Sequence, residues 1–438
     1  MSYLAERLDA LAESAARDTL APSLSVAVVE GGDIVYARAF GAANAGTVYN
    51  IASLTKQFTA ACMLLLQREG RLSLDEPVST WFPELTRAGD ITIRHLLSHS
   101  SGYADYYPLG YADSEKAYPT PPEEIVRRYA TRPLQFEPGT MWSYSNTGYH
   151  LAGLIIERVT GKRFQDVLAQ TVLQPAGMAS SYFDDPPRIQ GSHARGYTRY
   201  CLGPQREASP EQEGWLYASG GIASTAGDLA RWHTVLMTCA LLSQSELLEM
   251  TTPYALASGE PSASALGWFV EQRGDHRVIL HNGGIAGFAS QTIVSLDRRC
   301  SVAVLANADH VPTGAIATRL LEAVLPGATP PTPAVAADPE PAETAARGWL
   351  SSLASGDAAG LAMEPELRSY LDEGRLNDAR EGLTAAGALD GLALLASGER
   401  GGMAWHRVQA QFRSRKADVF FRQANSGALS EFNVFPMP

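Results

Sequence analysis

Residues 47–70 read TVYNIASLTKQFTAACMLLLQREG, and they join a strand-like segment to a helix. Thr47–Ile51 has the apolar and β-branched character of a strand. After it, apolar side chains recur at the spacing of one helix face, at Phe58, Cys62, Leu65 and Leu66. Gly70 is a plausible helix stop. The tetrapeptide Ser53-Leu54-Thr55-Lys56 therefore falls at the predicted start of a helix.

This tetrapeptide is a candidate nucleophile with its base. Residues three apart in a helix lie on the same face, so Ser53 and Lys56 are expected to be neighbours. A serine hydroxyl needs an adjacent base to attack at neutral pH. A lysine that is partly desolvated in a cleft has a lowered pKa and can serve as that base. The N–H groups of a helix start favour the oxyanion that forms after attack.

A Ser-x-x-Lys pattern alone also arises by chance in chains of this length. Here the chance is reduced because the chain has only four lysines, at Lys56, Lys116, Lys162 and Lys416. Only Lys56 has a serine three positions before it.

A second candidate is Tyr144-Ser145-Asn146, which follows the segment FEPGTMWS at 136–143. A tyrosine beside an ammonium group loses its proton more easily and can relay protons between nucleophile and leaving group. Asn146 can accept from Lys56 and donate to a substrate carbonyl. The alternative is an ordinary loop with a packed tyrosine.

A third candidate is His281-Asn282-Gly283-Gly284, predicted at the end of a strand over 278–280. Small residues at a strand edge let a substrate approach the backbone. The N–H of Gly284 is predicted to join that of Ser53 as an oxyanion donor. The alternative is a common glycine-rich turn.

Strand patterns lie near both ends of residues 1–325. A hairpin is predicted at 24–30 and 34–40, and strands at 267–271, 277–281, 289–295 and 301–307. Helices are predicted at 3–18, 91–98, 149–160, 226–239 and 315–325. This order predicts an α+β fold with one antiparallel sheet, flanking helices and an inserted all-helical subdomain, with a site in the cleft between them.

The remaining residues predict a linker and a second domain. Residues 326–343 are rich in proline and are expected to form a semi-rigid linker. Residues 344–438 show helical patterns and then strands near 391–397, 403–413, 417–423 and 428–435, which predicts a small α+β domain. Its order weakly resembles the fold shared by nuclear transport factor 2 and ketosteroid isomerase. No pattern in it indicates chemistry.

Composition narrows the class of protein. The net charge of −12 argues against a nucleic-acid or anionic-membrane partner. The four cysteines are scattered, which indicates reduced thiols, and the histidines form no ligand-spaced cluster, so no metal or other cofactor is expected. The N-terminus lacks the apolar core of a signal peptide. These features predict a cytoplasmic protein.

The three motifs in this order resemble the family of class C β-lactamases, penicillin-binding DD-peptidases and family VIII carboxylesterases, over roughly residues 10–325. Ser53-Leu54-Thr55-Lys56 matches its Ser-x-x-Lys and Tyr144-Ser145-Asn146 its Tyr-x-Asn. His281-Asn282-Gly283 takes the place of its Lys-Thr-Gly, in the His-x-Gly form of many relatives. The resemblance implies that Ser53 forms an acyl-enzyme while Lys56 and Tyr144 share the base role.

His281 is a departure that bears on the substrate. Lysine there is a permanent cation that suits a substrate carboxylate, whereas histidine is a weaker anchor at neutral pH. We therefore expect esterase or amidase action on uncharged acyl groups of small molecules, of the carboxylesterase type. The alternatives are a D-amino-acid peptidase or DD-peptidase, a weak β-lactamase, and a non-catalytic binding module.

Other site residues are predicted from position alone. Tyr103 and Tyr217 lie beside glycine-rich segments and are candidates to line the acyl pocket. His95 and His99 are expected to be structural. The C-terminal domain is expected to cover the cleft or to mediate homo-oligomer formation.

Overall fold

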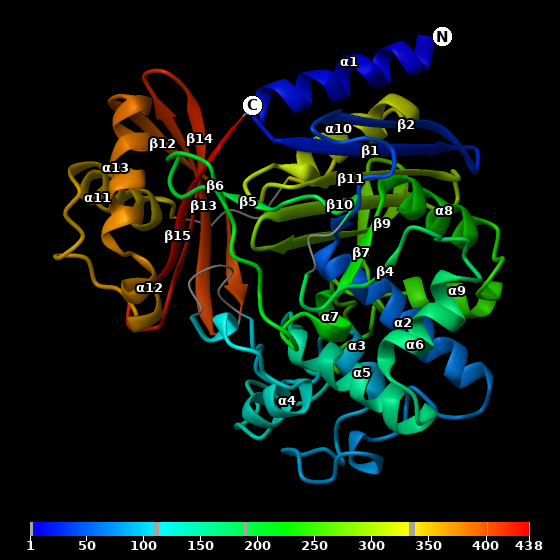
Figure 1. Cartoon of the computed structure of the whole chain (residues 1–438). Coiled ribbons are helices and arrows are strands. Elements are labelled where there is room, and N and C mark those ends of the chain that lie inside the picture. The colour runs from blue at the N-terminus through cyan, green and yellow to red at the C-terminus, as the bar shows by residue number, and fades with distance from the viewer. Residues whose placement is uncertain (1–2, 108–113, 188–190, 333–337, 401, 438) are drawn as a thin grey trace.

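The computed structural model describes the whole chain except residues 1–2, 108–113, 188–190, 333–337, 401 and 438. Figure 1 shows a large unit, which carries the N-terminus, beside a smaller C-terminal domain. The predicted α+β fold with an antiparallel sheet and flanking helices is confirmed.

The main sheet has six strands in the order β2-β1-β11-β10-β9-β8. The antiparallel pairing of β1 with β11 joins strands from the two ends of the large unit, with Leu24 opposite Ala306. The bounds are β1 Ser23–Glu30, β2 Asp33–Gly41, β8 Phe269–Arg273, β9 His276–Ile285, β10 Phe288–Ser295 and β11 Cys300–Ala306. These are the six strands that the sequence patterns predict.

Helices cover both faces of this sheet. The helices α1 (Tyr3–Asp18) and α10 (Thr313–Val324) pack together on one face, above the sheet in Figure 1. The helix α8 (Ala226–Met237) packs against β1 and β11 on the other. Because both faces are covered, β1 buries alternate side chains in two cores, with Val26 in one and Ala27 in the other.

The helix α2 (Thr55–Arg68) begins two residues after Ser53 and is buried from Thr55 to Leu66. It therefore holds the serine at a fixed point inside the molecule. Around it lie mostly short helices, namely α3 Ile93–Leu97, α4 Pro122–Ala130, α5 Asn146–Thr160, α6 Phe164–Leu168, α7 Tyr217–Gly220 and α9 Gln244–Thr251. Short strands accompany them: β3 Tyr49–Asn50, β4 Tyr182–Phe183, β5 Tyr197–Thr198, β6 Arg206–Glu207 and β7 Ile222–Ser224.

The strand β9 continues through the third motif. It was predicted to end at Leu280, but it runs to Ile285 and pairs with β10 throughout, with Gly283 opposite Ser290. The glycines are therefore not a turn. Gly283 and Gly284 belong to an interior strand of the sheet, at the point where that strand passes over the turn that carries Ser53.

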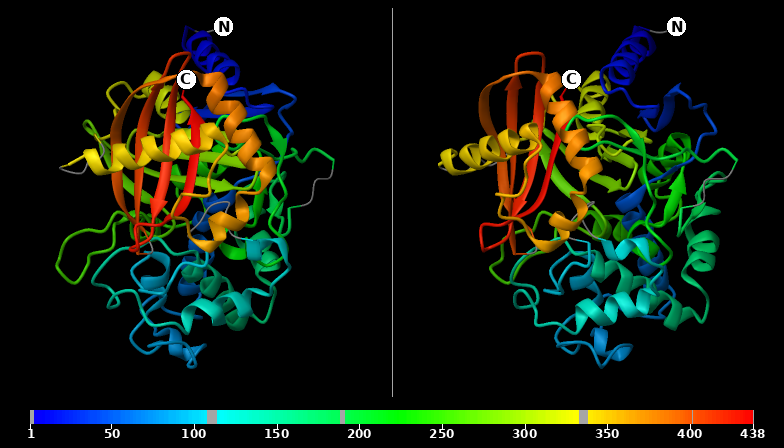
Figure 2. Two further views of the ribbon diagram at one scale, coloured as in Figure 1. Left: turned by 90° about the vertical axis from the view of Figure 1, so that its left-hand side faces the viewer. Right: turned by 60° about the vertical axis from the view of Figure 1, so that its left-hand side comes forward.

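The C-terminal domain is an antiparallel sheet covered on one face by helices. Figure 2 shows α11 and α13 on the outer face of the strands, away from the large unit. The bounds are α11 Glu340–Ser355, α12 Pro365–Tyr370, α13 Glu373–Ala386, β12 Leu389–Arg400, β13 Met403–Phe412, β14 Lys416–Gln423 and β15 Leu429–Pro436. The α11 helix starts inside the predicted linker 326–343, of which residues 333–337 lie outside the described residues. Pro341 fits the first helical turn because that turn needs no N–H donor there.

A loop of the large unit is built into the core of the C-terminal domain. Tyr200, Cys201 and Leu202 are buried among its helices and strands. The Leu202 N–H donates to the Val434 carbonyl at 3.2 Å, and the Cys201 N–H donates to Asn433 Oδ1 at 2.8 Å. This shared core fixes the domain against the large unit.

None of the helices in the described ranges has the length and apolar composition needed to cross a bilayer.

Candidate active site

Ser53 lies in a tight turn between β3 and α2. The preceding residue, Ala52, has a φ of +49°, which is strained for a residue with a Cβ. Its N–H is held by Asn50 Oδ1 at 2.8 Å. Ser53 is half-buried and lines a cavity of about 350 Å³. The turn thus presents a serine hydroxyl at the edge of this cavity.

Lys56 is fully buried directly behind this hydroxyl. Its Nζ lies 3.1 Å from Ser53 Oγ, 2.7 Å from Asn146 Oδ1 and 2.9 Å from the Ser219 carbonyl oxygen. A neutral amine would donate its two N–H bonds to Asn146 and Ser219. Its lone pair would then accept the hydrogen of Ser53 Oγ.

The surroundings favour this neutral amine. Burial lowers the pKa of Lys56 well below its usual range, and the charge of Arg400 lowers it further, while Asp105 opposes the shift. The side chain is therefore suited to accept a proton from Ser53.

Tyr144 lies beside Ser53 and just before α5. Its ring stacks on His99, with centroids 4.3 Å apart, and its centroid lies 5.0 Å from Lys56 Nζ. Burial raises the pKa of Tyr144 above its usual value, although a hydrogen bond with Ser53 opposes the shift. The phenol is therefore protonated at neutral pH and available as a proton donor.

His99 and His95 are structural, as the sequence suggested. His99 is buried, and its Nδ1 accepts from the Ser145 N–H at 3.1 Å, which fixes the loop that carries Tyr144. His95 completes the cap of α3 with Thr92, and its Nε2 lies 2.8 Å from the Tyr254 hydroxyl.

Asn146 is oriented by a buried carboxylate. Asp105 Oδ1 accepts from both the N–H and the Nδ2 of Asn146, each at 3.0 Å, so the amide oxygen faces Lys56. Burial alone would raise the pKa of Asp105, but Arg400 and the N–H donors hold it below its usual value. Asp105 is therefore an anion that supports the motif from behind.

Arg400 reaches this carboxylate from the end of β12 in the C-terminal domain. Its Nη2 donates to Asp105 Oδ2 at 2.5 Å and to the Tyr107 carbonyl at 3.3 Å. Its guanidinium carbon lies 4.7 Å from the centroid of the Tyr144 ring. The C-terminal domain therefore contributes directly to the wall of the cavity, as the predicted covering role requires.

His281 lies under the site rather than in it. It is 2% exposed, its ring lies against Phe269, and it is not one of the described residues that line the cavity. Burial and the nearby Lys56 lower the pKa of His281 to about 3, although its contact with the Asn282 carbonyl opposes the shift. His281 is thus a neutral packing residue here and does not face a substrate.

The neighbouring residues of β9 divide between packing and cavity. Asn282 and Gly284 line the cavity with Ser53, as the predicted substrate and oxyanion roles require. Gly283 does not line it. A Cβ at Gly283 would lie 2.3 Å from the Ile51 carbonyl oxygen, so glycine allows β9 to cross the Ser53 turn.

The two predicted pocket tyrosines lie elsewhere. The Tyr103 ring is buried and its hydroxyl donates to the Thr86 carbonyl at 3.0 Å. Tyr217 is buried against His150, Phe164 and Phe183 in the helical subdomain. Neither is among the described residues that line the cavity, because their aromatic rings complete the core instead.

The wall of the cavity is rich in aromatic side chains and includes residues of both domains. Its described lining residues are Ser53, Tyr106, Tyr107, Trp142, Tyr144, Asn146, Trp215, Leu216, Ser219, Gly220, Phe269, Asn282, Gly284, Ile285, Arg400 and Arg422. Among the ranges that the structure describes, no group of three His, Cys, Asp or Glu side chains is arranged to hold a metal ion.

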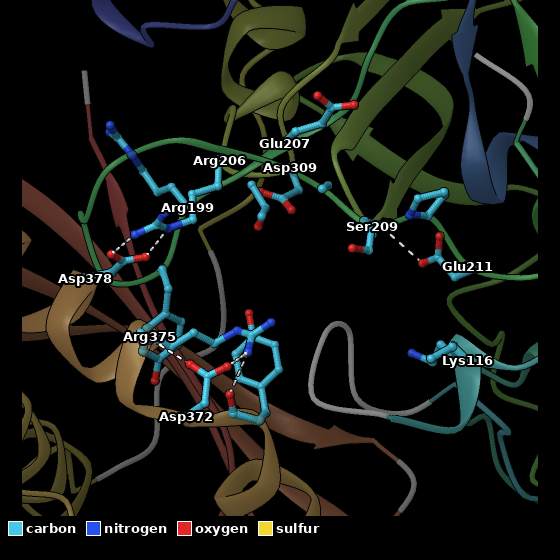
Figure 3. Close-up of a pocket in the computed structure, with 18 of the residues that line it drawn as sticks. Lys116, Arg199, Arg206, Glu207, Ser209, Glu211, Asp309, Asp372, Arg375 and Asp378 are labelled. Carbon is cyan, nitrogen blue, oxygen red and sulfur yellow. Dashed lines mark hydrogen bonds and ion pairs between the residues drawn. The ribbon is translucent and has the colours of Figure 1, made fainter.

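A second cavity, of about 510 Å³, lies between the two domains (Figure 3). Ser53 does not line it. Figure 3 shows ion pairs on its wall, including Arg206 with Asp378 across the domain boundary, at 2.5 Å, and Arg375 with Asp372. The Arg206–Asp378 pair helps to fix the domain that carries Arg400, whereas the Arg375–Asp372 pair lies within that domain.

Arg400, Asp105 and the Ser219 carbonyl were not among the predicted site residues. Arg400 lies in the sequence SGERGG, which is typical of an exposed hairpin end. Asp105 contacts Asn146, which lies 41 residues later in the chain, so no local spacing predicts its role.

A serine, a buried lysine and a half-buried tyrosine in mutual contact form a site for acyl transfer through a serine nucleophile. Residues 8–325 match the model of the family described as Beta-lactamase. The chain therefore belongs to the β-lactamase and penicillin-binding-protein family of serine hydrolases.

Particular relatives refine this placement. The chain is 30% identical over 311 residues to penicillin-binding protein 4* of Bacillus subtilis. The aligned region covers 65% of this chain and 68% of that protein. It is 36% identical over 203 residues to esterase EstB of Burkholderia gladioli. That aligned region covers 41% of this chain and 52% of the esterase.

One solved structure is similar over nearly the whole chain. It is the octameric penicillin-binding protein homologue from Pyrococcus abyssi, with a TM-score of 0.65 and 22% identity, covering 98% of this chain and 99% of that one. At this identity the likeness shows the fold alone, and it includes the C-terminal domain.

Proposed function

We propose that this protein hydrolyses ester or amide bonds of small molecules through an acyl-enzyme on Ser53, with a carboxylesterase-type activity. The observation that carries the proposal is the 3.1 Å approach of Lys56 Nζ to Ser53 Oγ in a site where burial lowers the lysine pKa. The similarity to an esterase supports the choice of bond.

The contacts suggest a division of the proton transfers. Ser53 Oγ attacks the carbonyl carbon while Lys56 Nζ takes its proton. The leaving group departs with a proton from Tyr144, which regains one from Lys56. Water then attacks the acyl-enzyme by the reverse transfers and releases the acid. The N–H groups of Ser53 and Gly284 are the proposed oxyanion donors.

The test is covalent labelling. A fluorophosphonate probe is expected to add one equivalent to the folded protein, with the adduct mapped to Ser53 by mass spectrometry. The Ser53→Ala variant and the urea-unfolded protein are the controls and should remain unlabelled. Folded protein that gives no adduct would refute the proposal.

A peptidase acting on D-amino-acid peptides, or a weak β-lactamase, is the second candidate, and the similarity to a penicillin-binding protein favours it. Turnover of nitrophenyl esters, D-alanyl peptides and nitrocefin separates the two. Appreciable nitrocefin hydrolysis with negligible ester hydrolysis would reverse the ranking.

A cytoplasmic location and a homo-oligomer formed through the C-terminal domain are further proposals. The octameric assembly of the Pyrococcus abyssi homologue motivates the second one. Light scattering of the purified protein measures it directly.

A further inference from the structure

The charges that face the catalytic cavity are supplied by the C-terminal domain. Arg400 at the end of β12 and Arg422 on β14 both line the cavity that contains Ser53. Among the described lining residues there is no Asp or Glu. This is notable in a protein with a net charge of −12, because acidic residues outnumber basic ones over the whole chain.

The carboxylates that balance these arginines lie behind them. Asp105 is buried, and its Oδ1 is already occupied by Asn146 and by the Tyr107 N–H at 3.0 Å. Glu431 is also buried and pairs with Arg422 at 3.2 Å. The partners therefore hold the guanidinium groups in place, while the cavity side of the pair is cationic.

Arg400 has hydrogen-bonding capacity left. The hydrogen bonds that Arg400 donates to Asp105 and Tyr107 use Nη2 alone, and within the described part of the chain its buried Nε has no hydrogen-bond partner. A guanidinium carries five N–H donors in a planar fork that matches a carboxylate. Its side chain is 24% exposed, which leaves a face open to the cavity.

The position of Arg400 suits a group on the substrate. Lys56 Nζ and the guanidinium carbon of Arg400 each lie within about 5 Å of the centre of the Tyr144 ring. A substrate whose carbonyl is at Ser53 can therefore place a group a few bonds away at Arg400. His281 cannot supply a cation there, because it is buried outside the cavity lining.

We propose that Arg400, assisted by Arg422, is a specificity-determining anchor for a carboxylate on the substrate, so that the enzyme prefers acyl donors carrying a negative charge a few bonds from the scissile carbonyl. The proposal deepens the function proposed above and rests on it. Substrates with a free ammonium group would be disfavoured at the same position.

A matched pair of esters tests this preference. The 4-nitrophenyl monoester of glutarate carries a free carboxylate, and 4-nitrophenyl valerate has the same chain length without it. The full-length enzyme is expected to show a kcat/KM for the glutarate ester at least about tenfold above that for the valerate ester, the size of one charge-assisted contact. A preference for valerate would overturn the proposal.

Variants identify the residue responsible. Arg400→Gln is expected to lower the glutarate-to-valerate ratio about tenfold, and Arg400→Lys, which keeps the charge but loses the fork, to lower it less. Arg407→Gln is the control, because Arg407 pairs with Asp418 in the same sheet and does not line the cavity. If Arg400→Gln lowers kcat/KM equally for the glutarate and valerate esters and leaves their ratio unchanged, Arg400 only fixes the position of the C-terminal domain and the inference is wrong.

A binding measurement separates this inference from the proposed function. Calorimetry with glutarate on the Ser53→Ala variant requires no turnover. We expect glutarate to bind to the Ser53→Ala variant, and we expect this binding to be lost when Arg400→Gln is added to the same variant. If the wild type reacts with fluorophosphonate but glutarate does not bind, the anchor is refuted and the hydrolase survives. If glutarate binds by way of Arg400 and Ser53 is unreactive, the hydrolase is refuted and the anion site survives.

Discussion

The fit of β9 against the Ser53 turn gives a prediction with a defined size. A Cβ placed on Gly283 would lie 2.3 Å from the Ile51 carbonyl oxygen, 2.3 Å from Ser290 Oγ and 3.0 Å from the Ala52 Cβ. The first two atoms are joined by a hydrogen bond of 2.8 Å. Gly283→Ala therefore forces the strand and the turn apart and breaks this bond.

The expected loss of stability follows from these two effects. Overpacking a rigid site costs about 1–3 kcal/mol, and the lost hydrogen bond about 1 kcal/mol more. We expect a total of about 2–4 kcal/mol. A displacement of about 1 Å at the nucleophile should also lower the acylation rate by roughly a hundredfold.

Gly284→Ala is the matched control for stability. A Cβ at Gly284 meets no atom within 4 Å, because this residue faces the cavity. Its stability should be unchanged or slightly higher, since alanine lowers the entropy of the unfolded chain.

Urea denaturation followed by tryptophan fluorescence measures the stability of both variants, and a nitrophenyl acetate burst measures acylation. Equal stabilities for the two variants, or an unchanged burst rate for Gly283→Ala, would refute the packing argument.

Three further predictions concern charge and domain contact. Because burial lowers the pKa of Lys56, the pH profile of kcat/KM should rise at a pH well below 10.5. A rise near the ordinary lysine pKa would contradict this assignment. Lys56→Gln should lower kcat by at least about 10³-fold. The His281 imidazole, with its pKa lowered to about 3, should show no titration between pH 5 and 8 by NMR. Arg206→Ala removes the partner of Asp378 at the domain boundary, so the urea midpoint of unfolding should fall slightly, while an unchanged curve would exclude a role in docking.

The sequence was most informative where chemistry depends on local spacing. Ser53 lies in a helical turn that runs directly into α2, three residues before Lys56, so their contact follows from helical spacing. The six strands of the main sheet were predictable because their apolar runs are separated by turns. The extent of β9 was not, because Gly283 and Gly284 have low strand propensity and are held in the sheet by pairing with β10.

The aromatic residues show a different limit. Tyr103 and Tyr217 lie beside glycine-rich segments, which suggested exposure to a pocket, yet both rings are buried in the core. The residues that do line the cavity include Trp142 and Phe269, which come from a loop and from β8. Which aromatic ring faces the core and which faces a cavity depends on tertiary packing that no local pattern encodes.

The third motif changes most in meaning. Its histidine was interpreted as a weakened anion anchor, and this favoured uncharged substrates. In the structure His281 is a neutral side chain packed under Phe269, so its identity carries no information about the charge of the substrate. The cations of the cavity come instead from Arg400, whose partner Asp105 is 295 residues earlier in the chain. A contact at such a separation leaves no spacing to detect. With Arg400 as the proposed anchor, the appended domain determines the charge preference. Two chains with identical Ser-x-x-Lys, Tyr-x-Asn and His-x-Gly motifs would then differ in substrate according to the residue at the end of β12.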